Sequence, residues 1–258
     1  MIYYKYNECF NDVELMTRQH YETDENENDV LVLGWNVKQP VHVLRQIFPN
    51  NRIIIYQLEQ LVVGNHWSTE HIVGSIRGAD EIWDYDINNI GLLKQYGIEA
   101  KFKPVLYTEE LKNIDNSENP DIDVLFYGLL SPRRAEFFQI LQNAQYFNVN
   151  MMLIHGIAGE KLNEYISRSK IILNLHSYAY HRQEQVRIFY PVINNKCVIS
   201  ESSEFNYFGN SIVEVPMTSL IFTISQYIQN GWWKTQGDSA AENFKKLSNN
   251  FKNVINPI

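Results

Sequence analysis

Short apolar runs alternate with longer amphipathic stretches along most of the chain. Each short run, such as residues 30–35 (VLVLGW) or 53–56 (IIIY), is bounded by polar residues and predicts a buried strand. The stretch that follows it carries apolar residues three and four positions apart, which predicts a helix. Strands that alternate with helices form parallel sheets with helices on both faces. The pattern therefore predicts an α/β protein.

The individual elements can be assigned from this pattern, except over residues 1–28, which show none. Ser68 is predicted to cap a helix, Gly97 to end one, and Pro104 to put its strand at a sheet edge. The predicted strands are residues 30–35, 53–56, 81–85, 100–106, 122–127, 149–154, 171–175, 197–200 and 212–215. The predicted helices are residues 41–48, 68–77, 88–96, 135–145, 159–168, 183–193, 220–229 and 241–254.

The alternation is interrupted once. Residues 109–121 (EELKNIDNSENPD) are polar and lack periodic apolar positions, which is typical of an interdomain linker. We therefore expect two domains, residues 1–115 and 116–258. Each is predicted to be Rossmann-like, with the two parallel sheets facing across a cleft that suits a small molecule.

Composition narrows the function further. The net charge is −8 and no basic stripe is visible, which argues against a nucleic-acid partner. The two cysteines, Cys9 and Cys197, suggest no disulfide framework, and Cys197 is predicted to be buried. No apolar run has membrane-spanning length, and the N-terminus lacks the pattern of a signal peptide. We expect a cytoplasmic protein without an integral membrane segment.

Polar side chains gather where two strands of the second domain end. Residues 170–201 read as strand, loop, helix and strand, so both strands are expected to be parallel, with their carboxyl ends at one edge. His176 and Ser177 follow the first strand, and Glu201 follows the second. In open α/β sheets ligands bind beyond this edge. The sequence therefore predicts a ligand site there.

Two pairs of charged residues suggest what that ligand is. Gly128, Arg133 and Arg134 lie in GLLSPRR, between a strand and a helix, where a close backbone approach and two guanidinium groups suit a phosphate. The alternative is a turn glycine with two solvated arginines. Glu184 and Arg187 share one helical face and suit a sugar hydroxyl and a phosphate. The alternative interpretation of Glu184 and Arg187 is a surface ion pair. The alternative interpretation of Glu201 is a helix cap in the next segment.

Further candidates are more isolated. His155 ends a strand at the same edge as His176, and the spacing of the two matches no zinc pattern. We take His155 and Glu184 as candidate catalytic groups. In the first domain Gln57 and Glu59 follow a strand and are candidates for the acceptor side, with an ordinary polar loop as the alternative.

One triplet, Asp84-Tyr85-Asp86, suggests a divalent metal on a diphosphate. Asp86 is equally well placed to cap the helix at Asn88, and we favour that interpretation. No metal ligand is therefore assigned.

With these residues in place, the second half resembles the nucleotide-sugar domain of glycosyltransferases of the two-Rossmann GT-B fold, especially the CgeB-like branch. The resemblance covers residues 121–215 and rests on three segments: VLFYGLLSPRR, IHGIAGEKLNEYISRSKIILNLHSY and RQEQVRIFYPVINNKCVISE. Two features of such families are missing. Glu184 has Val192, not a second glutamate, eight positions later, and no Gly-rich acceptor loop is present near the N-terminus.

The resemblance implies a metal-independent glycosyltransferase that uses a nucleotide-diphosphate sugar and no other cofactor. The Gly128 loop, Arg133 and Arg187 would offset charge on the diphosphate, and Glu184 and Glu201 would hold hydroxyls. A glycan, lipid or protein acceptor would enter from the first domain, and the last helix would pack back onto that domain. The alternatives are a metal-dependent transferase that uses Asp84 and Asp86, a non-catalytic nucleotide- or sugar-binding protein, and a DNA-base glucosyltransferase, which the acidic balance argues against.

Overall fold

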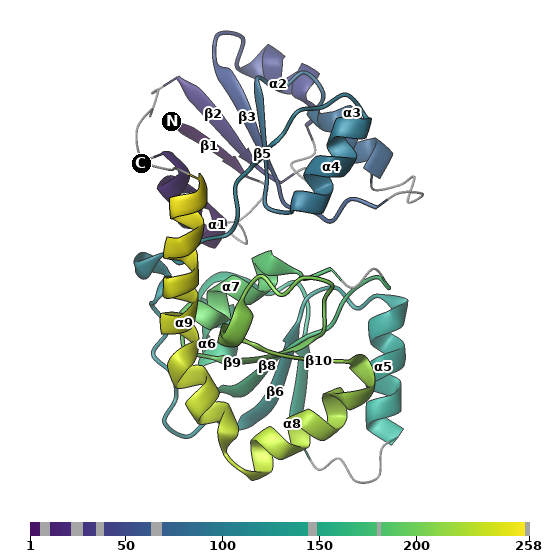
Figure 1. The fold of residues 1–258 in the computed structure, drawn as a ribbon, viewed down its shortest axis with the longest axis vertical. Helices are drawn as coiled ribbons and strands as arrows, with labels where there is room; N and C mark the ends of the chain where they lie inside the picture. Colours follow the sequence, from purple (N-terminus) through teal and green to yellow (C-terminus); the bar gives the residue numbers. More distant parts are fainter. Residues whose placement is uncertain are drawn as a thin grey trace. The chain divides into compact units, whose positions relative to one another are not determined.

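The computed structural model describes residues 1–5, 11–21, 28–34, 39–62, 69–143, 149–179 and 182–255. The chain divides into two compact units, Met1–Val105 and Leu106–Ile258. Each contains one sheet whose strands are all parallel, with helices packed on it (Figure 1). The predicted α/β class with two parallel sheets is confirmed. Cys9 and the predicted cap Ser68 lie outside the described residues.

The first sheet follows the order of the chain, β1-β2-β3-β4-β5. Every neighbouring pair is parallel, so each connection returns over a face of the sheet. As Pro104 suggested, the strand before it is an edge strand, paired with β4 alone. The strands are β1 (Ile2–Lys5), β2 (Asp29–Leu33), β3 (Arg52–Gln57), β4 (Glu81–Asp84) and β5 (Lys101–Phe102).

Alternate residues of these strands face two different layers. Val30, Ile53 and Ile82 pack under the helices α2, α3 and α4, while Tyr56 and Trp83 contact His20 behind the sheet. The helices of this unit are α1 (Asn11–Thr17), η2 (Arg18–Tyr21), α2 (Val41–Ile47), α3 (His71–Ile76) and α4 (Ile87–Gln95). The strand β1 and the helix α1 lie in the segment for which the sequence indicated no element.

The second sheet has the order β10-β9-β8-β6-β7. The chain adds β7 on one side of β6 and then returns to add β8 on the other, so the direction reverses between β6 and β8. Such a reversal opens a crevice at the carboxyl ends of the two strands. The strands are β6 (Ile122–Tyr127), β7 (Met151–Ile154), β8 (Ser169–Asn174), β9 (Cys197–Glu201) and β10 (Val213–Val215).

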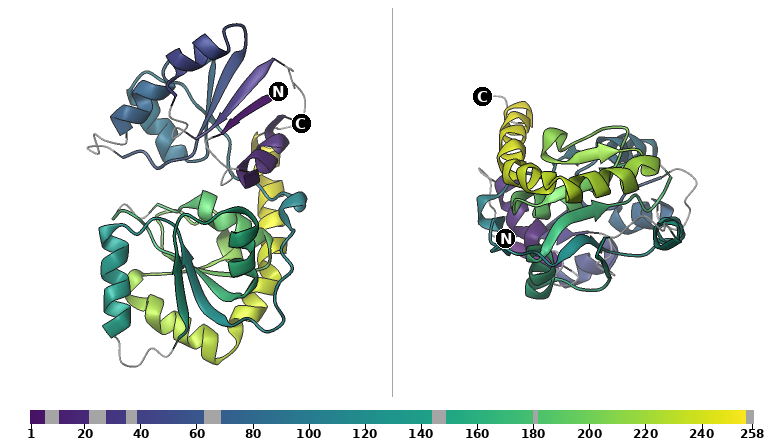
Figure 2. Two further views of the ribbon diagram at one scale, coloured as in Figure 1. Left: turned by 180° about the vertical axis from the view of Figure 1, so that it is seen from behind. Right: turned by 90° about the horizontal axis from the view of Figure 1, so that it is seen from below.

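Helices cover both faces of this second sheet (Figures 1 and 2). Phe137 of α5 and Leu220 of α8 pack on the face that carries Phe126 and Leu173, while α6 and α7 contact the sheet through other residues. Cys197 is buried in this unit, as predicted. The helices are η4 (Glu109–Leu111), α5 (Pro132–Asn143), α6 (Gly159–Ser167), α7 (Gln185–Ile193), η5 (Gly209–Ser211), η6 (Met217–Ser219), α8 (Leu220–Gln229) and α9 (Trp232–Ile255).

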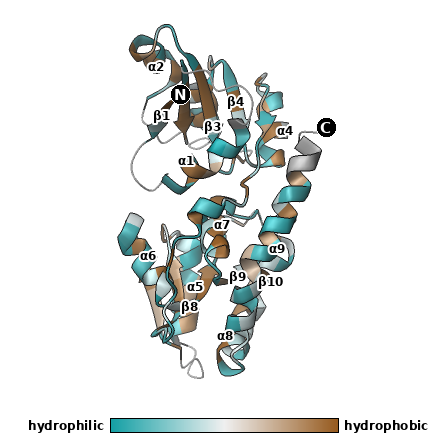
Figure 3. Ribbon diagram, turned by 90° about the vertical axis from the view of Figure 1, so that its left-hand side faces the viewer, coloured by the Kyte–Doolittle hydropathy of each residue, from teal (hydrophilic) through white to brown (hydrophobic). Residues whose placement is uncertain are grey.

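The helix α9 begins at Trp232, nine residues before the predicted start at Ala241. Gly237 interrupts the apolar spacing in this extra segment, and it is buried. A Cβ atom there would lie 2.6 Å from the carbonyl oxygen of Asn195 and 3.2 Å from the amide nitrogen of Cys197. The glycine therefore lets the helix backbone approach the start of β9. Figure 3 shows hydrophilic and hydrophobic residues alternating along α9, as expected for a helix with one buried face.

Asn194 is one of several side chains that hold the polar segment 109–121 to the rest of the second unit. Asn194 accepts hydrogen bonds from the backbone amides of Asn113 and Ile114, each at 2.9 Å, and donates to the carbonyl of Leu111. It also donates to Tyr190, so all four of its hydrogen-bonding positions are used. Leu111 is fully buried. The segment is thus tied to the end of α7.

No helix among the described residues is long and apolar enough to cross a membrane.

Replacing Gly237 by alanine is expected to destabilise the second unit. The new methyl group would press on backbone atoms that cannot move away as a side chain can, at a cost of about 1–3 kcal/mol. Urea unfolding monitored by far-UV circular dichroism measures the change.

Gly91→Ala is the matched control, because Gly91 is exposed in α4 and a Cβ there meets nothing within 4 Å. This control should be stabilising by about 0.5–1 kcal/mol. Equal effects of the two substitutions would contradict the packing role of Gly237.

Candidate functional site

The candidate site is the carboxyl edge of the second sheet, at the reversal between β6 and β8. Gly128 follows β6, His176 and Ser177 follow β8, and Glu201 is the last residue of β9. The parallel register of these strands brings the three loops together. The structure thus juxtaposes residues that lie up to 73 positions apart, as the strand pattern predicted.

Glu184 is the centre of one ion-pair cluster at this edge. Its Oε1 accepts hydrogen bonds from the Ser177 amide at 2.9 Å and from Arg134 Nη2 at 2.6 Å. Its Oε2 lies 3.4 Å from His176 Nδ1. Glu184 immediately precedes α7. The carboxylate therefore joins the loop after β8 to the helix that follows it.

Arg134 is almost fully enclosed, with 2% of its surface exposed. Its Nε and Nη2 both donate to the carbonyl of Leu175, at 2.9 and 2.7 Å, and Nη1 donates to the carbonyl of Leu129 at 2.7 Å. Every nitrogen of the guanidinium thus has a protein acceptor. Arg134 therefore connects the loops after β6 and β8.

Arg133 and Glu201 form a second pair. Arg133 Nη1 donates to Glu201 Oε2 at 2.7 Å, and Nη2 donates to Oε1, so the pair is bidentate. Glu201 Oε2 also accepts from the His176 amide at 3.2 Å, and Arg133 Nη1 donates to the His176 carbonyl at 3.1 Å. Glu201 is 1% exposed. Its oxygens are engaged within the protein, and the pair frames the loop that carries His176.

These contacts shift the protonation equilibria of the cluster. Burial alone would raise the pKa of Glu184, but the hydrogen bond to His176 and the charges of Arg187 and Arg134 lower it below the usual value. Burial would lower the pKa of His176, yet Glu184 and Glu201 raise it overall. Burial, together with the charge of Arg187, lowers the pKa of Arg134 to about 10. The Glu184 carboxylate is therefore held in the charged state at neutral pH.

Arg187 differs from Arg133 and Arg134. Its Nη1 is buried and has no hydrogen-bond partner. The guanidinium lies over Gly128, whose φ is +129°, and a Cβ atom at Gly128 would come within 2.7 Å of Arg187 Nη2. Its Cζ is also 5.6 Å from the ring centre of Phe126. A buried cationic nitrogen without an acceptor is costly unless a ligand or water supplies one.

His155 follows β7, the strand next to β6, and so lies at the same edge as Arg187. Its side chain is exposed. The Gly128 amide donates to the carbonyl of Ile154 at 3.1 Å, which fixes the loop after β6 against the residue before His155. Gly156, with φ +70°, turns the chain after it. The imidazole is therefore at the same edge as Arg187 and is accessible.

Three residues of this edge, Gln183, Asn206 and Glu214, had no distinguishing signal in the sequence. Gln183 Nε2 donates to Glu214 at 2.8 Å and to Asn206 Oδ1 at 3.3 Å, and Gln183 Oε1 accepts from the Tyr207 amide. Burial raises the pKa of Glu214. Because the three lie 8 to 31 positions apart and none ends a predicted strand, only the fold brings them together. They tie the loop after β9 to the start of α7.

The candidates in the first unit separate into buried and exposed residues. Gln57 is fully buried, and its amide donates to the Glu59 carbonyl at 2.6 Å and to Asp84 at 3.1 Å. Glu59 is exposed. Asp84 is fully buried and accepts from the amide of Asp86 and from Asn89, and burial raises its pKa well above the usual value.

Asp86 accepts a hydrogen bond from the Asn88 amide at 2.9 Å and caps α4, so the favoured cap interpretation is confirmed. Within the described residues no group of three histidine, cysteine or acidic side chains is arranged to hold a metal ion.

Comparison with known proteins supports the fold. No model of a known protein family matches the chain, and no curated protein matches it. Among solved structures, sucrose-phosphate synthase from Thermosynechococcus elongatus aligns with a TM-score of 0.56 at 11% identity, over 91% of this chain and 73% of that one. TarM aligns with a TM-score of 0.58 at 10% identity, over 88% of this chain and 54% of TarM.

A third structure, a UDP-forming α,α-trehalose-phosphate synthase from Burkholderia xenovorans, aligns with a TM-score of 0.53 at 8% identity, over 95% of this chain and 78% of that one. Identities this low establish similarity of fold alone. The predicted resemblance is confirmed at that level: the chain has the two-unit α/β fold of GT-B glycosyltransferases.

Proposed function

We propose that this protein is a glycosyltransferase that takes its sugar from a nucleotide-diphosphate sugar bound at the carboxyl edge of the second sheet. The observation that carries the proposal is the unpartnered, buried Nη1 of Arg187, held over the Cβ-free Gly128 at the reversal between β6 and β8. Phosphate oxygens are among the acceptors that a guanidinium binds most strongly. The fold shared with the solved transferases supports the same proposal.

In this proposal the diphosphate lies beside the Gly128 loop and against Arg187. Gly128 has no side chain, so the Arg187 guanidinium can lie against its backbone, and its φ of +129° is one that other residues rarely adopt. Arg187 would offset the negative charge that builds on the leaving diphosphate. Because Nη1 of the guanidinium is buried, the electrostatic gain on binding an anion there is larger than it would be at the surface.

The two ion-pair clusters serve as the framework for the Arg187 guanidinium. Glu184 holds Arg134 and the Ser177 amide, and Glu201 holds Arg133 and the His176 amide. We therefore assign Glu184, Glu201, Arg134 and His176 as positioning residues. Arg133, which is 22% exposed, is the other arginine that a bound diphosphate can reach.

The transfer itself breaks the bond between the sugar C1 and the diphosphate oxygen and forms a bond from C1 to the acceptor oxygen. The acceptor hydroxyl loses its proton in the process. We assign the exposed imidazole of His155 to receive that proton, because it is accessible and follows the strand next to the Gly128 loop. Glu59 of the first unit is kept as the acceptor-side candidate, since it is exposed while Gln57 is buried.

We further propose that the arginines, not a metal ion, carry the diphosphate charge. Both oxygens of Asp84 already accept hydrogen bonds from the protein, and Asp86 caps α4. The metal-dependent alternative requires these two carboxylates to be available as ligands.

The first prediction concerns Arg187. In Arg187→Ala, binding of UDP, GDP or ADP, whichever binds the parent protein, should weaken about 10- to 150-fold, the equivalent of one charge-assisted contact of ~1.5–3 kcal/mol. Gly128→Ala should weaken it comparably, because its Cβ displaces the guanidinium. The double variant should lose little more than either single one. Isothermal titration calorimetry without added metal gives the affinities.

Arg168→Ala is the control for this series. Arg168 is an exposed guanidinium that pairs with Asp121 away from the candidate edge, so its loss should leave nucleotide affinity unchanged. Parental affinity in Arg187→Ala would show that the diphosphate binds elsewhere.

The second prediction separates catalysis from binding. His155→Ala should lower kcat for transfer, or for hydrolysis of the donor by water, by about 10²- to 10⁴-fold, while nucleoside-diphosphate affinity stays at the parental value. His42→Ala, which removes an exposed histidine of the first unit, should change neither quantity. A protein that binds nucleotide yet never turns over a donor sugar would instead be the non-catalytic binding protein of the same fold.

The third prediction concerns metal. Asp86→Asn keeps a good helix cap but removes the charge, so transfer should stay within about twofold of the parent. An excess of EDTA should likewise leave transfer intact. Loss of activity in both experiments, restored by Mg²⁺ or Mn²⁺ in the chelator arm, would favour the metal-dependent alternative.

A further inference from the structure

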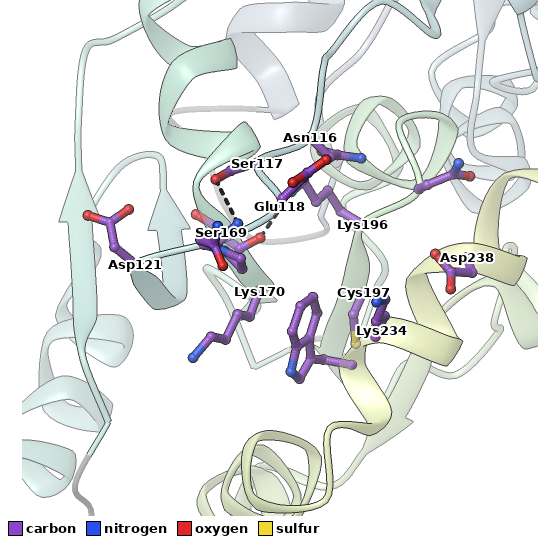
Figure 4. Close-up of a pocket in the computed structure, with 14 residues that line it drawn as sticks. Asn116, Ser117, Glu118, Asp121, Ser169, Lys170, Lys196, Cys197, Lys234 and Asp238 are labelled. Atoms are coloured by element: carbon purple, nitrogen blue, oxygen red, sulfur yellow. Dashed lines mark hydrogen bonds between the residues drawn. The ribbon is translucent and has the colours of Figure 1, made fainter.

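A pocket lies at the opposite, amino edge of the same sheet. It has a volume of about 840 Å³, within the range of small-molecule sites, and it lies wholly inside the second unit. Its walls are the segment before β6, the first residues of β8 and β9, and one side of α9 (Figure 4). None of its residues belongs to the carboxyl edge described above. The pocket is therefore separate from the proposed donor site.

Lys196 is the buried cation of this pocket. Its side chain is 5% exposed, and Nζ donates to the carbonyls of Ser167 at 2.9 Å and Ser169 at 3.0 Å. An ammonium group has three donors, so one is left, and neither of the two carbonyls carries a formal charge. Burial lowers the pKa of Lys196 to about 8. Only carbonyls stabilise this buried cation, so an anion bound at its remaining donor would stabilise the charge further.

The other wall adds a second cation and an aromatic face. Trp233 and Lys234 line the pocket from α9, one turn before Gly237. The close approach of Gly237 to the carbonyl of Asn195 sets this wall against the start of β9, where Lys196 lies. An indole offers a flat apolar surface for a ring, and Lys234 is exposed and able to reach an anionic group.

The remaining polar side chains suit hydroxyl groups better than a second anion. Glu118 and Asp238 line the pocket from opposite walls, and both oxygens of Asp121 are already bound by Arg168. Lys170 is likewise paired with Asp123. Carboxylates beside lysines would repel a polyanion but accept hydrogen bonds from sugar hydroxyls. The lining therefore combines one anion position, one ring surface and several hydroxyl acceptors.

We propose that this amino-edge pocket binds a sugar that carries a single acidic group, a phosphate or a carboxylate. The acidic group would lie between Lys196 and Lys234, the ring would lie against Trp233, and the hydroxyls would face Glu118 and Asp238. The proposal is independent of the transferase reaction, since it uses no residue of the donor edge.

Calorimetry on the full chain tests it with four probes: glucose 6-phosphate, glucuronate, glucose and inorganic phosphate. At least one of the two anionic sugars should bind saturably and at least 10-fold more tightly than glucose or phosphate. The stronger of the two identifies the acidic group. Quenching or enhancement of tryptophan fluorescence on binding provides an independent readout.

Two substitutions locate the site. Lys196→Met removes the ammonium but keeps an unbranched side chain, and it should weaken binding at least 10-fold. Lys234→Gln changes an exposed residue and leaves the fold intact, and it should weaken binding several-fold. Lys161→Gln, an exposed lysine of α6, and Arg187→Ala at the donor edge should have no effect.

The proposal is overturned if neither anionic sugar binds, or if inorganic phosphate alone binds as tightly. Binding that persists unchanged in Lys234→Gln and in a folded Lys196→Met, or that is lost in Arg187→Ala, would also overturn it.

Discussion

A charge taken out of water has to find an opposite charge or a hydrogen-bond acceptor, and the second unit depends on this constraint. At its carboxyl edge Glu184 and Glu201 bind Arg134 and Arg133, and the same carboxylates also accept backbone amides of the loop after β8. Removing Arg133 would take the bidentate cation away from the buried Glu201 carboxylate. The loops that a ligand would contact are therefore held by ion pairs, not by apolar packing alone.

Against this background the position of Arg187 is informative. Arg133 and Arg134 have acceptors within the protein, whereas Arg187 has a buried nitrogen without one. It stands where the sheet order reverses between β6 and β8, a place at which α/β proteins bind ligands. The strands of the first unit follow chain order in the described residues, so that sheet offers no such reversal. The asymmetry is the physical reason for placing the donor on the second unit.

The two edges of the second sheet use cations in different ways. The carboxyl edge uses buried carboxylates to neutralise its arginines, while the amino edge holds Lys196 with backbone carbonyls only. The helix α9 completes the amino edge, because Gly237 allows its backbone to approach the start of β9. A single glycine thus links the stability of the unit to the shape of the amino-edge pocket. An anion would improve the electrostatics of either edge, but through different groups.

The α/β class, most of the strands and helices, and the edge at which the polar residues gather could all be predicted from the sequence. This was possible because strand periodicity, turn residues and the parallel arrangement are local properties of the chain. The prediction missed β1, α1 and the first part of α9, where tertiary contacts such as that of Gly237 override a weak local pattern.

The partners within the site were decided only by the tertiary structure. Arg134 and Arg187 look alike in the sequence, yet every guanidinium nitrogen of Arg134 has an acceptor within the protein, while Nη1 of Arg187 has none. Glu184 and Arg187, read as a pair three residues apart, instead belong to neighbouring parts of one charge cluster. Burial and long-range hydrogen bonds set these differences, and they depend on which strands become neighbours, which no local spacing records.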